Sequence, residues 1–154
     1  MSSLTSAKLL WSADPRLVAW YQDVIAWFNT DFPGCELLVI QSYRTPSQQQ
    51  QAAAGGKSAY DGKTTFSMHQ AFPALALDLA VYDSHGNYVT DGTDPRYAWL
   101  GQHVDPDTMR WGGNFSNPDW DHVELTVAPA PDATAVAVGF VRYQTTCRVS
   151  EYLT

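Results

Sequence analysis

An acidic residue lies in the middle of an otherwise apolar segment. Asp78 is the one charged residue of Leu75–Tyr82, whose sequence is LALDLAVY. A short apolar run of this kind predicts a buried strand. A carboxylate that is buried, ionised and unpaired costs several kcal/mol, so Asp78 needs a compensating partner. An arginine side chain and a metal ion are the two partners that we consider.

Two histidines are candidates to share a metal ion with this carboxylate. His69 precedes Asp78 by nine positions, and His122 begins the segment HVELTV, whose alternation predicts a strand. Two imidazoles and one carboxylate leave the fourth position of a zinc ion open for water, which is the arrangement of catalytic zinc sites. The positive charge of such a complex lowers the pKa of the bound water to about 7.

Two further carboxylates stand just before His122, in the sequence DWDH. A metallopeptidase needs a carboxylate near the metal, outside the ligand set, to take a proton from water and pass it to the leaving amine. A short turn before the strand can hold Asp119 in that place. Asp121 is the rival, but it points to the opposite face if the strand has already begun. Both acids could instead be solvated turn or cap residues.

Four short blocks of sequence resemble the LAS-type zinc peptidases of peptidoglycan. This family includes D-alanyl-D-alanine carboxypeptidases and dipeptidases, and the L-alanyl-D-glutamate endopeptidases of phage endolysins. The blocks occur in the family's order and cover about half of the chain: Ser42–Pro46 with Gln49, Ser67–Asp78, Arg110–Phe115 and Asp119–Leu125. The common family form has seven positions from the first histidine to the aspartate. The nine found here match a longer variant that contains Pro73, and they leave Asp83 and His85 as alternative ligands.

The resemblance implies a role for each matching residue. It implies that His69, Asp78 and His122 bind zinc and that Asp119 is the general base and then the general acid. It places Arg44 where a guanidinium faces the scissile carbonyl, to stabilise the oxyanion or to bind a substrate carboxylate. The alternative for Arg44 is a surface residue that caps the next helix.

Other positions receive weaker assignments. Ser67 could bind the substrate's carboxylate or simply orient its own loop. Glu124 shares a strand face with His122 and could orient that imidazole, although a peripheral salt bridge is the simpler account. Gln49 is expected to pack or to hydrogen-bond behind the site. Four aromatic side chains could form walls of the cleft or belong to the core: Tyr43, Trp111, Phe115 and Trp120.

The elements that position these residues mix helices and strands without regular alternation, which predicts an α+β fold. Helices are predicted after Asp14-Pro15, after Thr45-Pro46 and after Asp94-Pro95, because each pair combines a capping residue with a proline suited to the first turn. Strands are predicted at Glu36–Gln41, Leu75–Tyr82 and His122–Val127, with a hairpin return at Tyr88–Thr90. Residues 133–143 suit either a helix or a strand. The resemblance implies a small antiparallel sheet that carries the zinc site and is flanked by helices, as in LAS and hedgehog-like folds.

Composition limits the classes of partner. The 154 residues suit a single peptidase domain, residues 1–154, and 45% of them are apolar, which excludes a disordered chain. The net charge of −7 argues against binding nucleic acid or an anionic membrane surface. Two distant cysteines predict neither a disulfide framework nor a zinc knuckle. We read neither a membrane-spanning run nor a secretion signal.

We therefore expect a Zn²⁺-dependent, monomeric hydrolase of the peptidoglycan stem peptide. The ending Asp119–Leu125 resembles endolysins, which favours an L-alanyl-D-glutamate endopeptidase that stays in the host cytoplasm until lysis and then acts on the cell wall. A D-alanyl-D-alanine carboxypeptidase or dipeptidase is the alternative. A carboxypeptidase must recognise a free terminal carboxylate, so a second basic residue beside Arg44 would favour it, and Lys57 or Lys63 is a candidate. A non-catalytic zinc-dependent domain that binds the cell wall is the alternative from another class.

Overall fold

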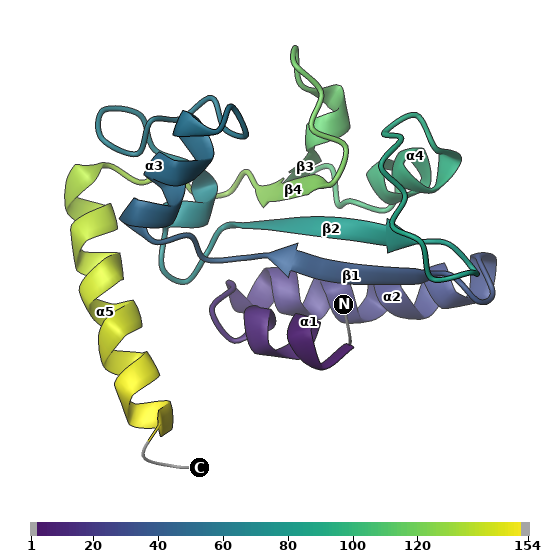
Figure 1. The fold of residues 1–154 in the computed structure, drawn as a ribbon, viewed down its shortest axis with the longest axis horizontal. Helices are drawn as coiled ribbons and strands as arrows, with labels where there is room; N and C mark the ends of the chain where they lie inside the picture. Colours follow the sequence, from purple (N-terminus) through teal and green to yellow (C-terminus); the bar gives the residue numbers. More distant parts are fainter. Residues whose placement is uncertain (1–2, 152–154) are drawn as a thin grey trace.

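The computed structural model describes residues 3–151, and it describes side chains from residue 6 to residue 147. The predicted domain, residues 1–154, therefore extends beyond the described part of the chain at both ends. The elements are given in chain order (Figure 1): α1 Ser3–Leu10, α2 Pro15–Asp31, β1 Glu36–Gln41, α3 Pro46–Ala54, the 3₁₀ turn η1 Met68–Gln70, β2 Ala76–Tyr82, α4 Pro95–Gln102, β3 Met109–Trp111, the 3₁₀ turn η2 Gly112–Asn114, β4 His122–Leu125 and α5 Ala133–Glu151.

Three helices begin where the capping signals predict. Asp14 accepts a hydrogen bond from the main-chain nitrogen of Arg16 at 3.0 Å, and Asp94 repeats this contact with Arg96 at the start of α4. Thr45 caps α3 together with the Gln48 side chain, which bonds back to the Thr45 nitrogen. Each cap satisfies main-chain donors that the helix leaves free and contributes about 1 kcal/mol.

The four strands form one antiparallel sheet in the order β1-β2-β4-β3. Asp78 lies directly opposite His122, and Ala76 lies opposite Glu124. Because side chains alternate along a strand, Asp78, His122 and Glu124 all lie on the same face of the sheet. The register therefore brings together a carboxylate and an imidazole that are 44 positions apart in sequence.

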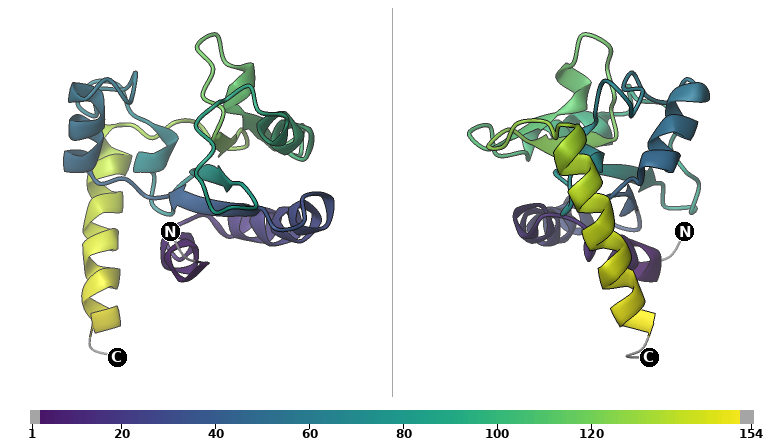
Figure 2. Two further views of the ribbon diagram at one scale, coloured as in Figure 1. Left: turned by 45° about the vertical axis from the view of Figure 1, so that its right-hand side comes forward. Right: turned by 90° about the vertical axis from the view of Figure 1, so that its left-hand side faces the viewer.

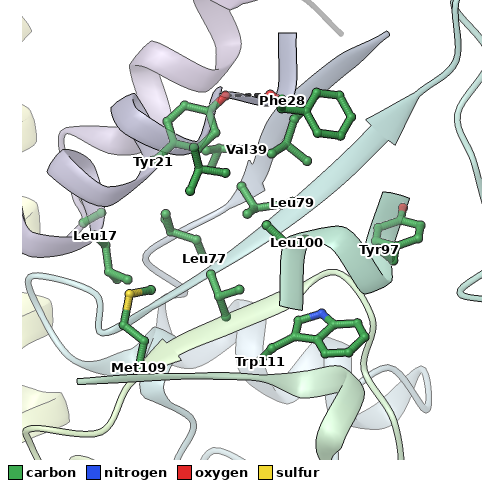
Figure 3. Packing of buried hydrophobic residues seen from close by; sticks show 14 of the residues in the cluster. Leu17, Tyr21, Phe28, Val39, Leu77, Leu79, Tyr97, Leu100, Met109 and Trp111 are labelled. Atoms are coloured by element: carbon green, nitrogen blue, oxygen red, sulfur yellow. Dashed lines mark hydrogen bonds between the residues drawn. The ribbon is translucent and has the colours of Figure 1, made fainter. Parts of the chain in front are cut away.

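The opposite face of the sheet forms the hydrophobic core, part of which Figure 3 shows. Every third or fourth residue of α2 is buried against it, as the helical spacing predicts. The α1 and α2 helices lie together along β1 and β2 in Figure 1, and the Ser6 hydroxyl of α1 contacts the main chain of Val39 on the edge strand. The largest contributors to the core are Leu17, Tyr21, Phe28, Leu77, Leu79, Leu100 and Trp111. One face of the sheet thus packs against the hydrophobic core, and the other face carries polar side chains.

The structure resolves the ambiguous segment in favour of a helix and corrects two local predictions. Residues 133–143 belong to α5, which packs through a stripe of residues spaced as in a helix. The expected return strand at Tyr88–Thr90 is limited to a single bridge between Tyr82 and Tyr88. Residues 109–111 form an edge strand, although we assigned no strand there. In the described part of the chain, no helix has both the length and the apolar character that crossing a bilayer requires.

Candidate metal centre

Hydrogen bonds hold both the ring and the main chain of His69. It lies in the 3₁₀ turn η1, and its nitrogen donates to the Ser67 hydroxyl that caps the turn. Its Nδ1 lies 2.6 Å from the carbonyl oxygen of Ser42, and its own carbonyl accepts from the nitrogen of Arg44 at 2.8 Å. A carbonyl oxygen can only accept, so Nδ1 carries the proton. In a neutral imidazole, Nε2 then presents a lone pair.

His122 has the complementary arrangement. Its Nε2 lies 2.8 Å from Oε2 of Glu124, a carboxylate that accepts the ring proton. In the neutral ring the lone pair is therefore on Nδ1, which lies 3.0 Å from Oδ1 of Asp78. A hydrogen bond from the second ring nitrogen to a carboxylate is the usual way in which proteins orient a histidine that binds metal. The orienting role suggested for Glu124 has the geometry that it requires.

Three acceptor atoms meet at one point on this face of the sheet. Nε2 of His69 and Nδ1 of His122 each lie 3.0 Å from Oδ1 of Asp78 and 3.3 Å from each other. Zinc bound tetrahedrally at about 2.0–2.1 Å keeps its ligand atoms roughly 3.3 Å apart, so the spacing fits such an ion. Lone pairs that face one another repel, and a cation between them removes the repulsion. These residues form the candidate metal centre: His69, Asp78 and His122.

The charges around the centre favour a cation. Burial alone would lower the pKa of His122, but hydrogen bonds to Asp78 and Glu124 and their charges outweigh burial and raise this pKa to about 10. Burial would raise the pKa of Asp78, yet the two imidazoles outweigh it and hold this pKa far below its ordinary value. In the absence of a metal ion, His122 therefore carries the positive charge that the carboxylates require. Metal binding displaces that proton.

Arg110 completes a chain of charges behind His122. Its Nε donates to Oε1 of Glu124 at 2.6 Å, and its Nη2 pairs with the same oxygen. Burial would raise the pKa of Glu124, but His122 and Arg110 together lower it, so this buried residue stays a carboxylate. Arg110 lies opposite Glu124 in the β3–β4 register. This role of Arg110 cannot be predicted from the sequence, because residue types do not reveal which strands pair.

Arg44 reaches the centre from the other side. Its Nη2 lies 3.4 Å from Oδ2 of Asp78, and its Nη1 donates to the Gln49 side chain at 3.0 Å. Gln49 is fully buried and donates in turn to the Ser58 hydroxyl and to the carbonyl of Tyr60. Gln49 thus fixes the guanidinium, which agrees with the expectation that it supports the site. Arg44 lies beside the metal ligands, not on an open surface.

Asp119 lies one short turn before His122 and is exposed. Its nitrogen donates to the Gly112 carbonyl at 3.0 Å, and its carbonyl accepts from the His122 nitrogen at 3.2 Å. A side chain at position 112 would lie 2.3 Å from the carbonyl oxygen of Asp119 and 3.0 Å from Cβ of His122. Only glycine at position 112 lets Asp119 approach the metal-binding strand so closely.

Asp121 lies in the turn immediately before β4, which begins at His122, so strand alternation does not set the direction of its side chain. It lines a pocket of about 200 Å³ together with Asp119 and Trp120. Burial raises the pKa of Asp121 to about 8, and the charges of Asp78 and Asp119 add to the rise. The structure therefore places Asp121 beside Asp119 at this pocket, just before the strand begins.

The remaining predicted residues differ in their surroundings. Tyr43 and Trp111 are buried, and the Trp111 ring nitrogen donates to the carbonyl of Trp120 at 2.7 Å. Trp120 is half-buried. Ser67 is buried as the cap of η1, which matches the loop-orienting alternative. The alternative ligands Asp83 and His85 lie in the turn after β2, where Asp83 accepts from the His85 nitrogen.

The chain is similar to known proteins in its three-dimensional structure. No protein-family profile matches the chain. No curated protein matches it. The crystal structure of the Serratia marcescens L-Ala D-Glu endopeptidase ChiX superposes with a TM-score of 0.60 at 21% identity, covering 81% of this chain and 89% of that one. The vancomycin-resistance D,D-pentapeptidase VanY, an E175A variant with Zn(II), gives a TM-score of 0.47 at 18% identity and covers 82% and 78% of the two chains. The predicted α+β class is confirmed, and the chain has the fold of the endopeptidase ChiX.

Proposed function

We propose that this chain is a zinc peptidase that hydrolyses the stem peptide of peptidoglycan between L-alanine and D-glutamate. The observation that carries the proposal is the meeting of three acceptor atoms at 3.0–3.3 Å, each oriented by a second partner. A buried set of two imidazoles and one carboxylate at this spacing is suited to a divalent cation. The choice of substrate rests on the likeness of the fold to ChiX and on the resemblance of the four sequence blocks.

Zinc would be held by Nε2 of His69, Oδ1 of Asp78 and Nδ1 of His122. When bound, it supplies a Lewis acid that polarises the scissile carbonyl and lowers the pKa of water to about 7. Glu124 and Ser42 keep the two imidazoles in the tautomers that bind metal. Arg110 keeps Glu124 ionised.

Asp119 supplies the proton transfers. It stands beside His122, exposed to the solvent from which water and substrate enter. It accepts a proton as the water oxygen bonds to the carbonyl carbon. It then delivers that proton to the amide nitrogen, so the C–N bond breaks and a neutral amine leaves. The carboxylate returns to its starting state, and the charge balances over the cycle.

Arg44 is placed to stabilise the charge that develops on the carbonyl oxygen. Its guanidinium lies next to a metal ligand and is fixed by Gln49. A positioned donor costs no rearrangement when the oxyanion forms, and one such donor contributes roughly 10²–10³-fold to the rate. The same fork could bind a carboxylate of the substrate in a carboxypeptidase. Lys57 and Lys63, the candidates for a second basic residue in that alternative, are exposed on the loop before η1.

Digestion of purified peptidoglycan tests the proposal. Mass spectrometry of the products should show cleavage between L-alanine and D-glutamate with the zinc-loaded chain. Release of terminal D-alanine instead would establish the carboxypeptidase. Asp119→Ala should bind zinc and leave the peptidoglycan intact. If neither protein cleaves but both bind cell walls equally, the chain is a binding domain. Loss of turbidity in permeabilised cells checks the expected lytic activity.

A further inference from the structure

An aromatic cluster connects the last helix to the loop that carries a metal ligand. It consists of Trp11, Tyr43, Phe72 and Tyr143. The Tyr143 ring of α5 stacks on Trp11 with centroids 5.6 Å apart and planes 18° apart. It also lies 4.6 Å from the Tyr43 ring and 5.8 Å from the Phe72 ring, again between centroids. The cluster thus joins four segments that are far apart in sequence.

Helix α5 docks on this cluster through one narrow stripe. Val136 and Gly139 are buried, and Tyr143 continues the stripe one turn later. A Cβ at position 139 would lie 3.1 Å from Cβ of Phe72 and 3.3 Å from its main-chain nitrogen, so glycine lets the helix touch the Phe72 backbone. Val141, on the other side of the helix, is 60% exposed.

The other side of the cluster reaches His69 along two routes. Phe72 lies in the segment between the ligands His69 and Asp78. Tyr43 lies between Ser42, whose carbonyl accepts from the His69 ring, and Arg44, whose nitrogen donates to the His69 carbonyl. Movement of the cluster would therefore shift the contacts that aim Nε2 of His69.

The sheet core does not depend on this helix. Among the described side chains, none from α5 belongs to the core cluster between α2, α4 and the sheet. Figure 2 shows α5 standing beside the body of the molecule and extending beyond it. The helix can therefore detach while the sheet and its two ligands, Asp78 and His122, stay in place.

We propose that α5 is a positioning element for the metal centre: Gly139 and Tyr143 clamp the loop of His69 in the conformation that binds zinc. The inference rests on the metal centre of the proposed function. Docking of α5 and binding of zinc then stabilise each other by the same factor, as linkage requires. Tyr143 acts through Phe72 and Tyr43 and does not touch the metal.

Variants of the stripe test this inference through zinc affinity, measured by competition with a chromophoric chelator. Tyr143→Ala and Gly139→Val should weaken zinc binding by about tenfold or more, which is the scale found when groups behind a metal ligand are removed. Val141→Ala, on the exposed side of the same helix, is the matched control and should bind as the wild type does. Tyr143→Phe keeps the ring and should restore the affinity. Equal affinities in Tyr143→Ala and Val141→Ala would overturn the inference.

Hydrogen exchange in the unaltered chain provides a second test that needs no variant to fold. A detached helix frays, because most helical stability comes from packing, so its amides report docking. Zinc should slow the exchange of the α5 amides by about tenfold. The exchange rates of the amides in the sheet core serve as the reference for this change. Unchanged exchange in α5 on zinc binding would refute the coupling. Failure of the wild type to bind zinc would refute the proposed function. If the wild type binds zinc and cleaves peptidoglycan, but the α5 variants bind zinc equally well, only this inference is refuted.

Discussion

The stability of the metal-free protein should fall as pH rises from about 6.5 to about 10. The cause is His122, whose pKa is raised from its ordinary value of 6.5 to about 10 by Asp78 and Glu124. A group with a raised folded-state pKa stabilises the fold fully below its unfolded-state value and loses that contribution as pH approaches the folded-state value. One titrating proton corresponds to 1.36 kcal/mol per pH unit, so between pH 6.5 and 9 the loss from His122 is roughly 3 kcal/mol.

Asp121 contributes in the same direction over part of this range. Its pKa is raised from 3.8 to about 8, so ionisation of this buried residue also lowers stability as pH rises towards 8. Asp121→Asn removes this second titration and isolates the contribution of His122. His122→Gln in that background should flatten the profile, because glutamine does not titrate. His85→Gln is the matched control, since His85 is exposed.

Urea unfolding in the presence of a chelator measures the effect. The free energy of unfolding of Asp121→Asn should be lower at pH 9 than at pH 6.5 by a few kcal/mol, and His85→Gln should not change that difference. Zinc should remove most of the dependence by replacing the proton, with release of about one proton near pH 7. A flat profile for the metal-free Asp121→Asn protein would refute our description of the charges at the centre.

Three other substitutions test separate parts of the site. Asp119→Ala should leave the zinc affinity and the folding stability unchanged, because Asp119 is exposed. It should lower the rate of hydrolysis of isolated muropeptides by roughly 10²–10⁴-fold. Full activity would transfer the role of general base to Asp121. Glu124→Gln should weaken zinc binding by roughly tenfold, because the charge that orients His122 is lost, and chelator competition would detect this. Tyr43→Phe should leave the free energy of unfolding unchanged or raise it by about 1 kcal/mol in thermal unfolding, because the buried Tyr43 hydroxyl has no hydrogen-bond partner among the described residues. A marked loss of stability would show that the hydroxyl has a partner.

The candidate metal centre could be predicted from sequence because an acid inside an apolar strand is a strong local signal. Asp78 needed a partner, and the alternation around His122 indicated a second strand with its imidazole on a defined face. The helix starts were equally readable, because aspartate or threonine followed by proline specifies a cap through local contacts alone.

The parts that sequence did not reveal depend on pairing between distant segments. Arg110 supports Glu124 only because β3 pairs with β4 in one register. The Ser42 carbonyl orients His69, but every residue has a carbonyl, so residue type carries no signal. Tyr43 is in a conspicuous motif, and only the packing of α5 reveals that it is buried. Strand register, the position of main-chain acceptors and helix docking all depend on tertiary structure.

The three residues of the candidate metal centre come from different elements: two lie on neighbouring strands and one lies on a short turn outside the sheet. Hydrogen bonding within the sheet fixes the separation of Asp78 and His122, whereas His69 is anchored to residues 42 and 44. The number of residues between positions 69 and 78 therefore does not set the separation of Asp78 and His122, which comes from the pairing of β2 with β4. A search pattern with a fixed gap between the first histidine and the aspartate will overlook homologues of this kind, and a pattern tied to the strand pair will retain them.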